Sequence, residues 1–341
     1  MLELKNLTPF LAAVVPGIDS DGQEIATVTV KGTFVLPQGT SSEPLQVHEC
    51  QAAIAMADVP FGEPADKTSI RYAAESCPTK TGTDVALIGH AYPAPGSDSV
   101  VDVGLRVGPL TKVVRVFGDR TWSRGVGRAR PSPPRRFSKM PLVFERAFGG
   151  WDTASSDPKE HDFEPRNPVG VGFAASRASN PAGMPLPNLE DPRLLIAAQA
   201  DRPAPACFGF IAPSWLPRRA RAGTYDDRWQ QERCPMLPLD FNPEFFQSSP
   251  VDLVVRGHLK GGERVAVSNA TPAGELAFTV PRRTLEIGVW IRGELAIHRS
   301  VMDTLVIEPD EQRVLCTWKT TFACSRKFLY IDLIRIREVA P

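Results

Sequence analysis

Residues 141–152 read Pro141-Leu-Val-Phe-Glu-Arg-Ala-Phe-Gly-Gly-Trp-Asp152 and open a central region, residues 141–246, that shows almost no helical or strand periodicity. Glycine, proline, asparagine and aspartate recur every few residues, and each of them favours specific turns. Disordered segments are poor in aromatic residues, whereas aromatic side chains continue throughout this region. We therefore expect an ordered but irregular region, held by the aromatic residues Trp151, Phe173, Trp215, Tyr225, Trp229 and Phe241.

Both flanks of the central region have the pattern of β-structure. Before it, Thr27–Leu36 is a β-branched run, and residues 101–107 and 112–118 form two short strands around a glycine-containing loop, which predicts a hairpin. After it, short apolar runs and turn residues alternate through residues 251–341. Strands spaced by about 8–12 residues are typical of antiparallel sandwiches and barrels. We expect a mainly β fold with two antiparallel sandwich-like or barrel-like flanks, an ordered irregular centre and few short helices.

These changes in pattern divide the chain into four predicted regions. The alternative is one composite domain over residues 1–341, in which the two flanks share a sheet system. The predicted regions are a β-rich region at 1–118, a connector at 119–140, an irregular core region at 141–250 and an antiparallel β region at 251–341.

The predicted connector is basic and rich in proline. We interpret it as a solvated loop, because runs of charge are usually solvated; the alternative is a contact with an anionic partner. Its basic residues are Arg120, Arg124, Arg128, Arg130, Arg135, Arg136 and Lys139.

The composition argues against partners that are recruited by charge. Of the 341 residues, 39 are lysine or arginine and 39 are aspartate or glutamate, so the formal net charge is zero. No overall field attracts nucleic acid or an acidic membrane surface, and no run approaches the roughly 18 apolar residues of a membrane-spanning helix. The six cysteines are scattered and the first residues lack a signal-peptide pattern, which predicts reduced thiols. We expect a soluble, cytoplasmic protein that binds neither nucleic acid nor membranes.

The sequence lacks the short motifs of common enzyme classes. It contains no G-x-S-x-G, no H-E-x-x-H and no P-loop lysine motif. His48 and Cys50 are two residues apart, so a strand would place them on one face, but a metal site needs further ligands. We therefore expect no catalytic residues, no metal and no cofactor.

Glu145 and Arg146 stand between apolar neighbours, so at least one of them should be partly buried and paired. We interpret the pair as a structural clamp that orders the loops, because a guanidinium can donate to several carbonyls. The alternative is a general acid. In that case the protein would be a hydrolase or a carbohydrate-active β protein, with Glu145 paired with Asp152 or Asp226.

The same region offers candidate anchors for a protein partner, because tryptophan, tyrosine and phenylalanine are enriched at interfaces. We expect some of these rings to hold the loops together and others to be exposed. The candidate partner-binding residues are Trp151, Phe173, Trp215, Tyr225, Trp229, Phe245 and Phe246.

An ordered series of motifs resembles a bacterial family catalogued as domain of unknown function 2169 (DUF2169). The resemblance covers most of the chain. The motifs are Pro141–Gly150, Asn167–Gly170 with Gly172-Phe173, Pro187–Asp191, Gly209–Trp215 with Pro217-Arg218, Gly223–Asp226 with Trp229, Leu237–Phe241, Gly257 with Gly261–Glu263, and Asp303–Glu311.

The resemblance implies a role in type VI secretion, because families of this type are encoded beside the VgrG spike, PAAR-like tip proteins and toxic effectors. It implies an adaptor or chaperone that helps to load an effector onto the spike and is not itself injected. It supplies no catalytic residues. The rival to this adaptor role, besides the hydrolase, is a structural piece of the secretion machine.

Overall fold

The computed structural model describes residues 2–94, 96, 98–123, 129–174, 181–324 and 328–340. About 41% of the structure is strand and 9% is helical, which confirms the expected mainly β fold. The strands form several open sheets rather than a closed barrel. No helix in the described parts is long and apolar enough to cross a membrane.

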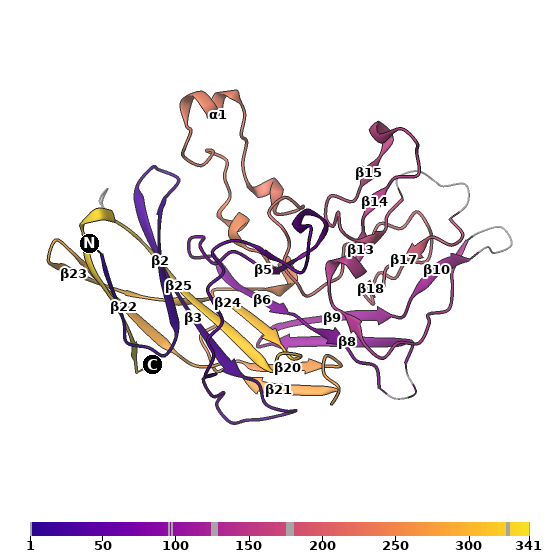
Figure 1. The fold of residues 1–341 in the computed structure, drawn as a ribbon, viewed down its shortest axis with the longest axis horizontal. Helices are drawn as coiled ribbons and strands as arrows, with labels where there is room; N and C mark the ends of the chain where they lie inside the picture. The colour runs from indigo at the N-terminus through magenta and orange to yellow at the C-terminus, as the bar shows by residue number, and fades with distance from the viewer. Residues whose placement is uncertain are drawn as a thin grey trace.

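The largest sheet has six strands and combines both ends of the chain (Figure 1). Its order is β19-β6-β24-β25-β3-β2, and only β6 and β24 run parallel. The strands are β2 (Leu11–Ile18), β3 (Glu24–Val35), β6 (Gly82–Leu87), β19 (Val254–Arg256), β24 (Val301–Glu308) and β25 (Arg313–Ala323).

Two further sheets complete the framework. A five-stranded sheet has the order β18-β9-β8-β20-β21, and a four-stranded sheet has the order β1-β26-β22-β23. The first contains the expected hairpin, β8 and β9. The strands are β8 (Val100–Val107), β9 (Leu110–Phe117), β18 (Leu189–Glu190), β20 (Arg264–Ser268), β21 (Glu275–Thr279), β1 (Glu3–Asn6), β22 (Thr284–Ile291), β23 (Glu294–Arg299) and β26 (Ile331–Val339).

The two predicted flanks lie in the same sheets. β3 pairs with β25, β6 with β24, and β8 with β20, so strands from residues 1–118 alternate with strands from residues 251–341. One hydrophobic cluster contains buried side chains from all three sheets, among them Val30, Leu105 and Ile287. The flanks therefore share a core, and the proposed domain boundaries stay a prediction.

The central region follows a dense path of turns with short bridges between them, as its sequence indicates. Its longest helix is α1 (Asp227–Glu232). The remaining short strands of the chain are β4 (Val59–Pro60), β5 (Ile70–Tyr72), β7 (His90–Ala91), β10 (Arg120–Ser123), β11 (Arg130–Pro131), β12 (Met140–Pro141), β13 (Phe148–Gly149), β14 (Trp151–Asp152), β15 (Asp162–Phe163), β16 (Val171–Gly172) and β17 (Pro185–Leu186). The 3-10 helices are η1 (Ala65–Lys67), η2 (Phe144–Arg146), η3 (Pro158–Glu160), η4 (Arg219–Arg221), η5 (Pro243–Phe246), η6 (Val251–Leu253) and η7 (Phe328–Tyr330).

The six-stranded sheet has one apolar face and one mixed face with polar and apolar side chains, and both carry buried residues. In β3, Val28 and Val30 belong to the shared core, whereas Thr29 and Lys31 point to the other side because strand residues alternate. Residues 48–80 lie across that other side; we call them the covering segment. Its backbone is bound to the sheet, since Thr29 Oγ1 donates to Glu75 O at 3.1 Å and Lys31 Nζ donates to Ala53 O at 3.0 Å.

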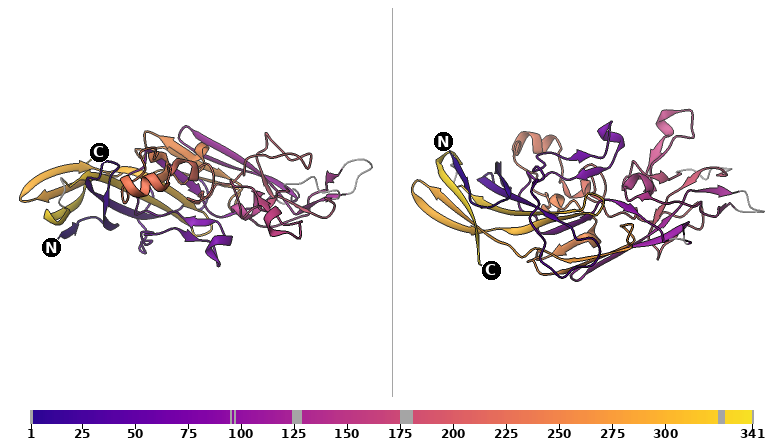
Figure 2. Two further views of the ribbon diagram at one scale, coloured as in Figure 1. Left: turned by 90° about the horizontal axis from the view of Figure 1, so that it is seen from above. Right: turned by 60° about the horizontal axis from the view of Figure 1, so that its bottom comes forward.

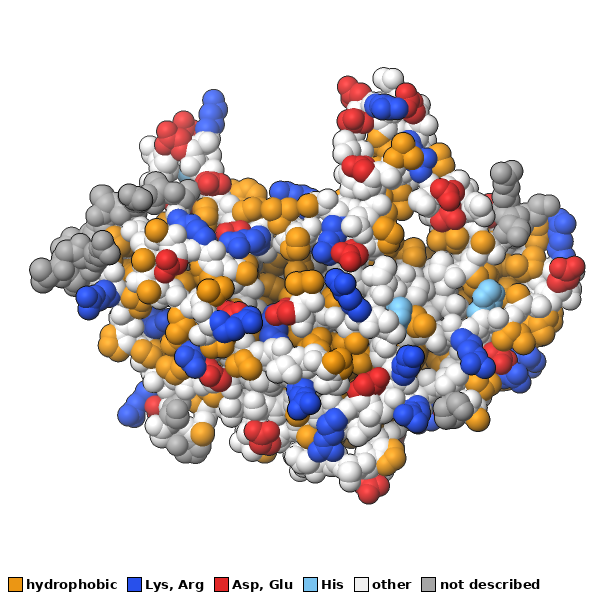
Figure 3. Space-filling view, turned by 180° about the vertical axis from the view of Figure 1, so that it is seen from behind, with side chains coloured by type: hydrophobic (Ala, Val, Ile, Leu, Met, Phe, Trp, Pro, Cys, Tyr) orange, Lys and Arg blue, Asp and Glu red, His pale blue; other side chains and the backbone are white. Residues whose placement is uncertain are grey.

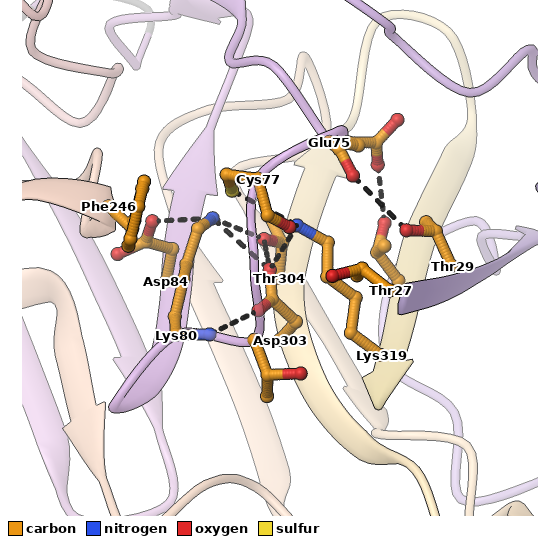
Figure 4. Close-up of polar contacts among 12 residues, drawn as sticks. Thr27, Thr29, Glu75, Cys77, Lys80, Asp84, Phe246, Asp303, Thr304 and Lys319 are labelled. Atoms are coloured by element: carbon orange, nitrogen blue, oxygen red, sulfur yellow. Dashed lines mark hydrogen bonds and ion pairs between the residues drawn. The ribbon is translucent and has the colours of Figure 1, made fainter. Parts of the chain in front are cut away.

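Buried charges fill the space between the sheet and the covering segment (Figure 4). Lys80 Nζ lies 2.8 Å from Asp84 Oδ2 and 3.3 Å from Asp303 Oδ2, and Lys319 Nζ lies 3.4 Å from the same Asp303 oxygen. Thr304 Oγ1 accepts from Lys80 Nζ at 2.8 Å. These residues, together with the buried Lys31–Glu75 pair, form what we call the ionic layer.

The ionic layer is neutral, and its members are hydrogen-bonded. Burial alone would raise the pKa of Asp303, but the ammonium groups of Lys80 and Lys319 outweigh it and lower that pKa below 3.8. Burial alone would lower the pKa of Lys80, but Asp303 and Asp84 outweigh it and raise that pKa. Each charge therefore depends on a partner from another segment, because a buried charge without a partner is strongly unfavourable.

Removing one of these charges should weaken the whole fold. In the Asp303→Asn variant, two ammonium groups remain buried with one carboxylate fewer, and we expect a loss of about 3–5 kcal/mol in unfolding free energy. Chemical denaturation measures this loss. The control is Glu311→Gln, whose half-exposed carboxylate pairs with Arg71 and should contribute less than about 1 kcal/mol. An equal effect of both variants would contradict the role given to the ionic layer.

The pH dependence of stability should report the same group. Since the pKa of Asp303 is lower in the folded state, its contribution is present above its ordinary pKa of 3.8 and is lost as pH falls through the folded value. The difference in unfolding free energy between wild type and Asp303→Asn should stay constant from about pH 9 to about pH 6 and shrink below about pH 4. A difference that shrinks already near neutral pH would contradict this assignment.

Candidate partner-binding surface

The end of the central region is attached to the ionic layer. The Asp84 carboxylate accepts from Gln247 Nε2 at 2.9 Å and from Ser248 N at 2.8 Å, besides its pairing with Lys80. Gln247 Oε1 in turn accepts from Gly82 N at 3.2 Å. One buried carboxylate thus joins the C-terminal part of the central region to strand β6.

Asn167 joins the loops at the other end of the central region. Its side chain is fully buried, and its amide nitrogen donates to Phe144 O at 2.8 Å and to Phe148 O at 3.0 Å. Gly150 adopts a positive φ of 92°, and a Cβ at this position would collide with the carbonyl oxygen of Gly170. The side chain of Asn167 and the absence of one at Gly150 let the two segments lie directly against each other.

A second joint connects the predicted connector to the central region. Arg120 is buried, lies over the ring of Phe117 at 3.6 Å and forms an ion pair with Glu190. The interpretation of the connector as a solvated loop is therefore wrong for Arg120, because Glu190 compensates its charge inside the protein. Arg124 and Arg128 lie outside the described residues.

Glu145 and Arg146 point to different neighbours. Glu145 accepts from Ser69 N and Ser69 Oγ, both at 2.7 Å, and so holds the covering segment against the central region. Arg146 Nη1 donates to Asn188 Oδ1 at 3.2 Å and lies 3.5 Å from Asp119 Oδ1. The two residues do not pair with each other; each connects a different pair of segments.

The β14–β15 hairpin forms a projection that carries Trp151. The Trp151 ring is 54% exposed and stacks on Phe163, with 4.5 Å between ring centroids. Asp152 Oδ1 accepts from Ala154 N at 3.0 Å and shapes the following turn. The hairpin holds its tryptophan on a short paired scaffold and leaves one face of the ring open to solvent.

Residues 223–242 form a second projection, with α1 at its tip. The Asp226 side chain caps α1 by accepting from Trp229 N at 2.8 Å, and Trp229 Nε1 donates to Met236 O at 2.8 Å. Tyr225 packs edge-on against Trp229 at 4.6 Å and is 53% exposed, while Leu239 is 81% exposed. Trp229 therefore holds this loop together, and Tyr225 and Leu239 face solvent.

The remaining predicted anchors lie deeper. Phe245 and Phe246 are half-buried and form a cluster with Phe241, with ring centroids 5.4 Å to 6.0 Å apart. Phe173 is half-buried beside Arg202. Trp215 is buried in the shared core, where its ring packs edge-on against Phe144 at 5.5 Å. Trp215 cannot contact a partner in this structure, so its place among the anchors is wrong.

The two projections rise from the same side of the molecule, with the β4–β5 ribbon between them (Figures 1 and 2). The space-filling view shows a hollowed surface between the projections, with hydrophobic side chains at its base (Figure 3). The ribbon adds exposed apolar residues that the sequence analysis did not select, Val59 and Phe61, and Met56 precedes it. Single apolar residues in an irregular segment carry no periodicity that would have indicated them. We call the two projections and this ribbon the projection face.

The carboxylates of the enzyme alternative are used in local structure. Glu145 binds Ser69, Asp152 shapes a turn and Asp226 caps α1. His48 Nδ1 accepts from Cys50 N at 2.9 Å, which closes a turn between the two candidate metal ligands. Within the described residues, no cluster of three or more His, Cys, Asp or Glu side chains has the arrangement of a metal site.

A family model described as "Uncharacterized protein conserved in bacteria (DUF2169)" matches residues 21–319. The chain belongs to the DUF2169 family. No curated protein and no solved structure matches it.

The motifs that carry the family resemblance include several residues that join segments of the irregular region. Asn167 joins two loops, Asn188 Nδ2 donates to Phe117 O at 3.0 Å, and Arg218 donates to Ile211 O and Phe245 O, both at 2.8 Å. In the DUF2169 chain, these motif residues hold the irregular region in one conformation. Of the exposed residues of the projections, Tyr225 and Leu239 lie within these motifs and Trp151 directly follows one.

A change at Asn167 should loosen the central region. Asn167→Asp removes both amide donations and places a carboxylate against carbonyl oxygens, so we expect faster hydrogen exchange of residues 141–173 and a loss of at least about 2 kcal/mol in stability. The control is Asn242→Asp, where the side-chain oxygen accepts from Glu244 N at 2.9 Å and a carboxylate can do the same. Unchanged exchange in the Asn167 variant would show that this side chain does not hold the loops.

Proposed function

We propose that this protein is an adaptor or chaperone of a type VI secretion system, which binds an effector or a PAAR-like tip protein and helps to load it onto the VgrG spike. The observation that supports binding is the projection face. Exposed aromatic and aliphatic side chains, Trp151, Tyr225 and Leu239, stand on loops that are held by caps and buried joints. Interfaces use such rigid aromatic anchors because few rotamers are lost when they are buried.

The proposal includes cytoplasmic action before secretion, and binding rather than catalysis. The secretion role is what the resemblance to the DUF2169 family implies. Membership of this family and the presence of the projection face support it. The hollow between the projections has a shape that suits a protruding segment of a protein partner (Figure 3). A binding role requires that the partner stays attached, whereas an enzyme would release its product.

The first experiment is affinity purification of the tagged protein from its native host, followed by mass spectrometry of the co-eluting chains. The proposal predicts one effector or PAAR-like protein at near-equal stoichiometry, and no adaptor in the secreted fraction. A protein that elutes alone, or that is secreted with the spike, would contradict the loading role.

The contact residues can then be tested with the recovered partner. We expect Trp151→Ala and Tyr225→Ala each to weaken binding by more than about 1 kcal/mol, as truncation of an interface anchor does. The matched control is Leu7→Ala, a residue that is 57% exposed just after β1, whose sheet with β22 and β23 lies at the end of the molecule away from the β14–β15 projection (Figure 1). Titration calorimetry measures the affinities. Equal affinity of all variants for the partner would exclude the projection face as the binding surface. The identity of the partner, known from the purification, would not be affected.

A further inference from the structure

β23 is an edge strand without the usual protection. In the described parts of the chain it pairs with β22 on one side only. The β22–β23 hairpin forms one end of the molecule in two views (Figures 1 and 2). Native edges are commonly protected by proline, charged side chains or a bulge. Glu294–Arg299 contains no proline or lysine, has Glu294 and Arg299 only at its ends, and pairs with β22 in unbroken register.

The turn of the hairpin determines which backbone groups face the free edge. Arg292 and Gly293 have φ values of 53° and 81°, as in a two-residue turn that closes on the pair Ile291–Glu294. After the strand, Ser300 N donates to Leu285 O at 3.1 Å, so every second residue from Glu294 to Ser300 bonds to β22 or to its start. The even-numbered residues of β23 therefore bond to β22, and the N–H and C=O groups of Leu295, Ile297 and Arg299 point outward.

The side chains of β23 are also distributed by face. Leu295 and Ile297 are 48% and 58% exposed and lie on the outer face of the sheet, opposite Trp290 and Gly288 of β22. Glu294, Ala296 and His298 point to the other face. The strand thus offers an apolar row on one face, and Glu294 and His298 at the two ends of the other face, where the His298 ring stacks on Phe322 with 4.8 Å between ring centroids. Burial lowers the pKa of His298.

We propose that β23 pairs with β23 of a second copy of this chain, antiparallel and around a two-fold axis at Ala296. In this register Leu295 of each copy lies opposite Ile297 of the other, and both residues have their backbone groups at the free edge. On the opposite face, Glu294 of each copy lies opposite His298 of the other. The two four-stranded sheets become one continuous sheet, and two unprotected edges are covered.

The sequence of β23 favours the register centred on Ala296 and a second copy of the chain as the partner. Two residues that lie opposite each other in an antiparallel pair must have side chains on the same face of the sheet. The two-fold axis must therefore pass through a residue and not between two residues. A centre at Ile297 would place Ile297 opposite itself, Leu295 opposite Arg299 and Ala296 opposite His298. One apolar pair would then remain in place of two, and Glu294 would no longer face His298. Leu295 and Ile297 complement each other within one strand of six residues, and the Glu294 carboxylate can accept a hydrogen bond from the His298 imidazole, which favours a second copy over an unrelated chain.

The interface is small, so the dimer should be weak. A stable complex typically buries about 800 Å² on each partner, and one strand edge with two apolar side chains buries less. We expect a dissociation constant in the range of about 1–100 μM. The proposal is independent of the secretion role, because it concerns the end of the molecule away from the β14–β15 projection.

Sedimentation velocity of the full chain from about 1 to about 300 μM tests the association. Wild type should shift from monomer to dimer, and Ile297→Lys should stay monomeric, because it places a charge in the apolar row. Leu7→Lys is the matched control, with similar exposure beside the other edge of the same sheet, and should dimerise as wild type does. A wild type that stays monomeric throughout, or an Ile297→Lys variant that dimerises fully, overturns the proposal.

Disulfide trapping tests the register. Facing Ala296 residues would form a non-hydrogen-bonded pair with Cα atoms about 4.5 Å apart, within the range of a disulfide. In a background in which the exposed Cys50 and Cys234 are replaced by serine, Ala296→Cys should cross-link into a dimer on mild oxidation and Ile297→Cys should not. Cross-linking at Ile297 alone, or of neither variant at dimer concentrations, contradicts pairing around Ala296.

Discussion

Burial of four charges, on Lys80, Asp84, Asp303 and Lys319, is the constraint on which the rest of the structure depends. Charges away from water are tolerated only when partners and hydrogen bonds compensate them. Lys80 and Asp84 come from residues 80–84, whereas Asp303 and Lys319 come from β24 and β25 more than 200 residues later in the sequence. Correct pairing of these charges therefore requires that both ends of the chain are in place. The ionic layer provides specificity for one arrangement, whereas the shared apolar core provides the larger driving force.

This constraint explains how an irregular region can present a defined surface. Asp84 is both a member of the ionic layer and the acceptor for Gln247 and Ser248, so the end of the central region is attached to the sheet. Glu145 binds Ser69 of the covering segment, and Asn167 binds the loop carbonyls near the β14–β15 projection. The projections therefore stand on loops that are hydrogen-bonded at both ends. A partner that binds Trp151 and Tyr225 would meet side chains that are already positioned.

Alternation of apolar and polar residues was sufficient to predict the strands. It identified β8 and β9 and the series of short strands in residues 251–341, such as β20 and β22, which have one face in the core and one face toward more polar surroundings. The β-branched run of β3 predicted a strand but not its burial on both faces, since Thr29 and Lys31 are covered by another segment. Which segment covers a strand depends on contacts between residues distant in sequence, and periodicity contains no information about them.

The candidate site was predictable in its location and not in its details. Aromatic content correctly indicated an ordered centre, and Trp151 and Tyr225 are exposed as expected. Composition could not separate them from Trp215, because the same ring serves as a core residue when Phe144 and the sheet surround it. Nor could it indicate Lys80, Asp84, Asp303 and Lys319, which resemble ordinary surface charges until their partners are known.

Hydrogen exchange of the native protein, followed by mass spectrometry, tests most directly whether the ionic layer holds these segments together. The account predicts that amides of residues 70–84 and 247–249 exchange as slowly as those of β24 and β25, although most of them belong to irregular segments. Exchange would then occur through global unfolding. Fast exchange of these residues, while the amides of β24 and β25 exchange slowly, would show that the covering segment opens independently. That result would contradict the account.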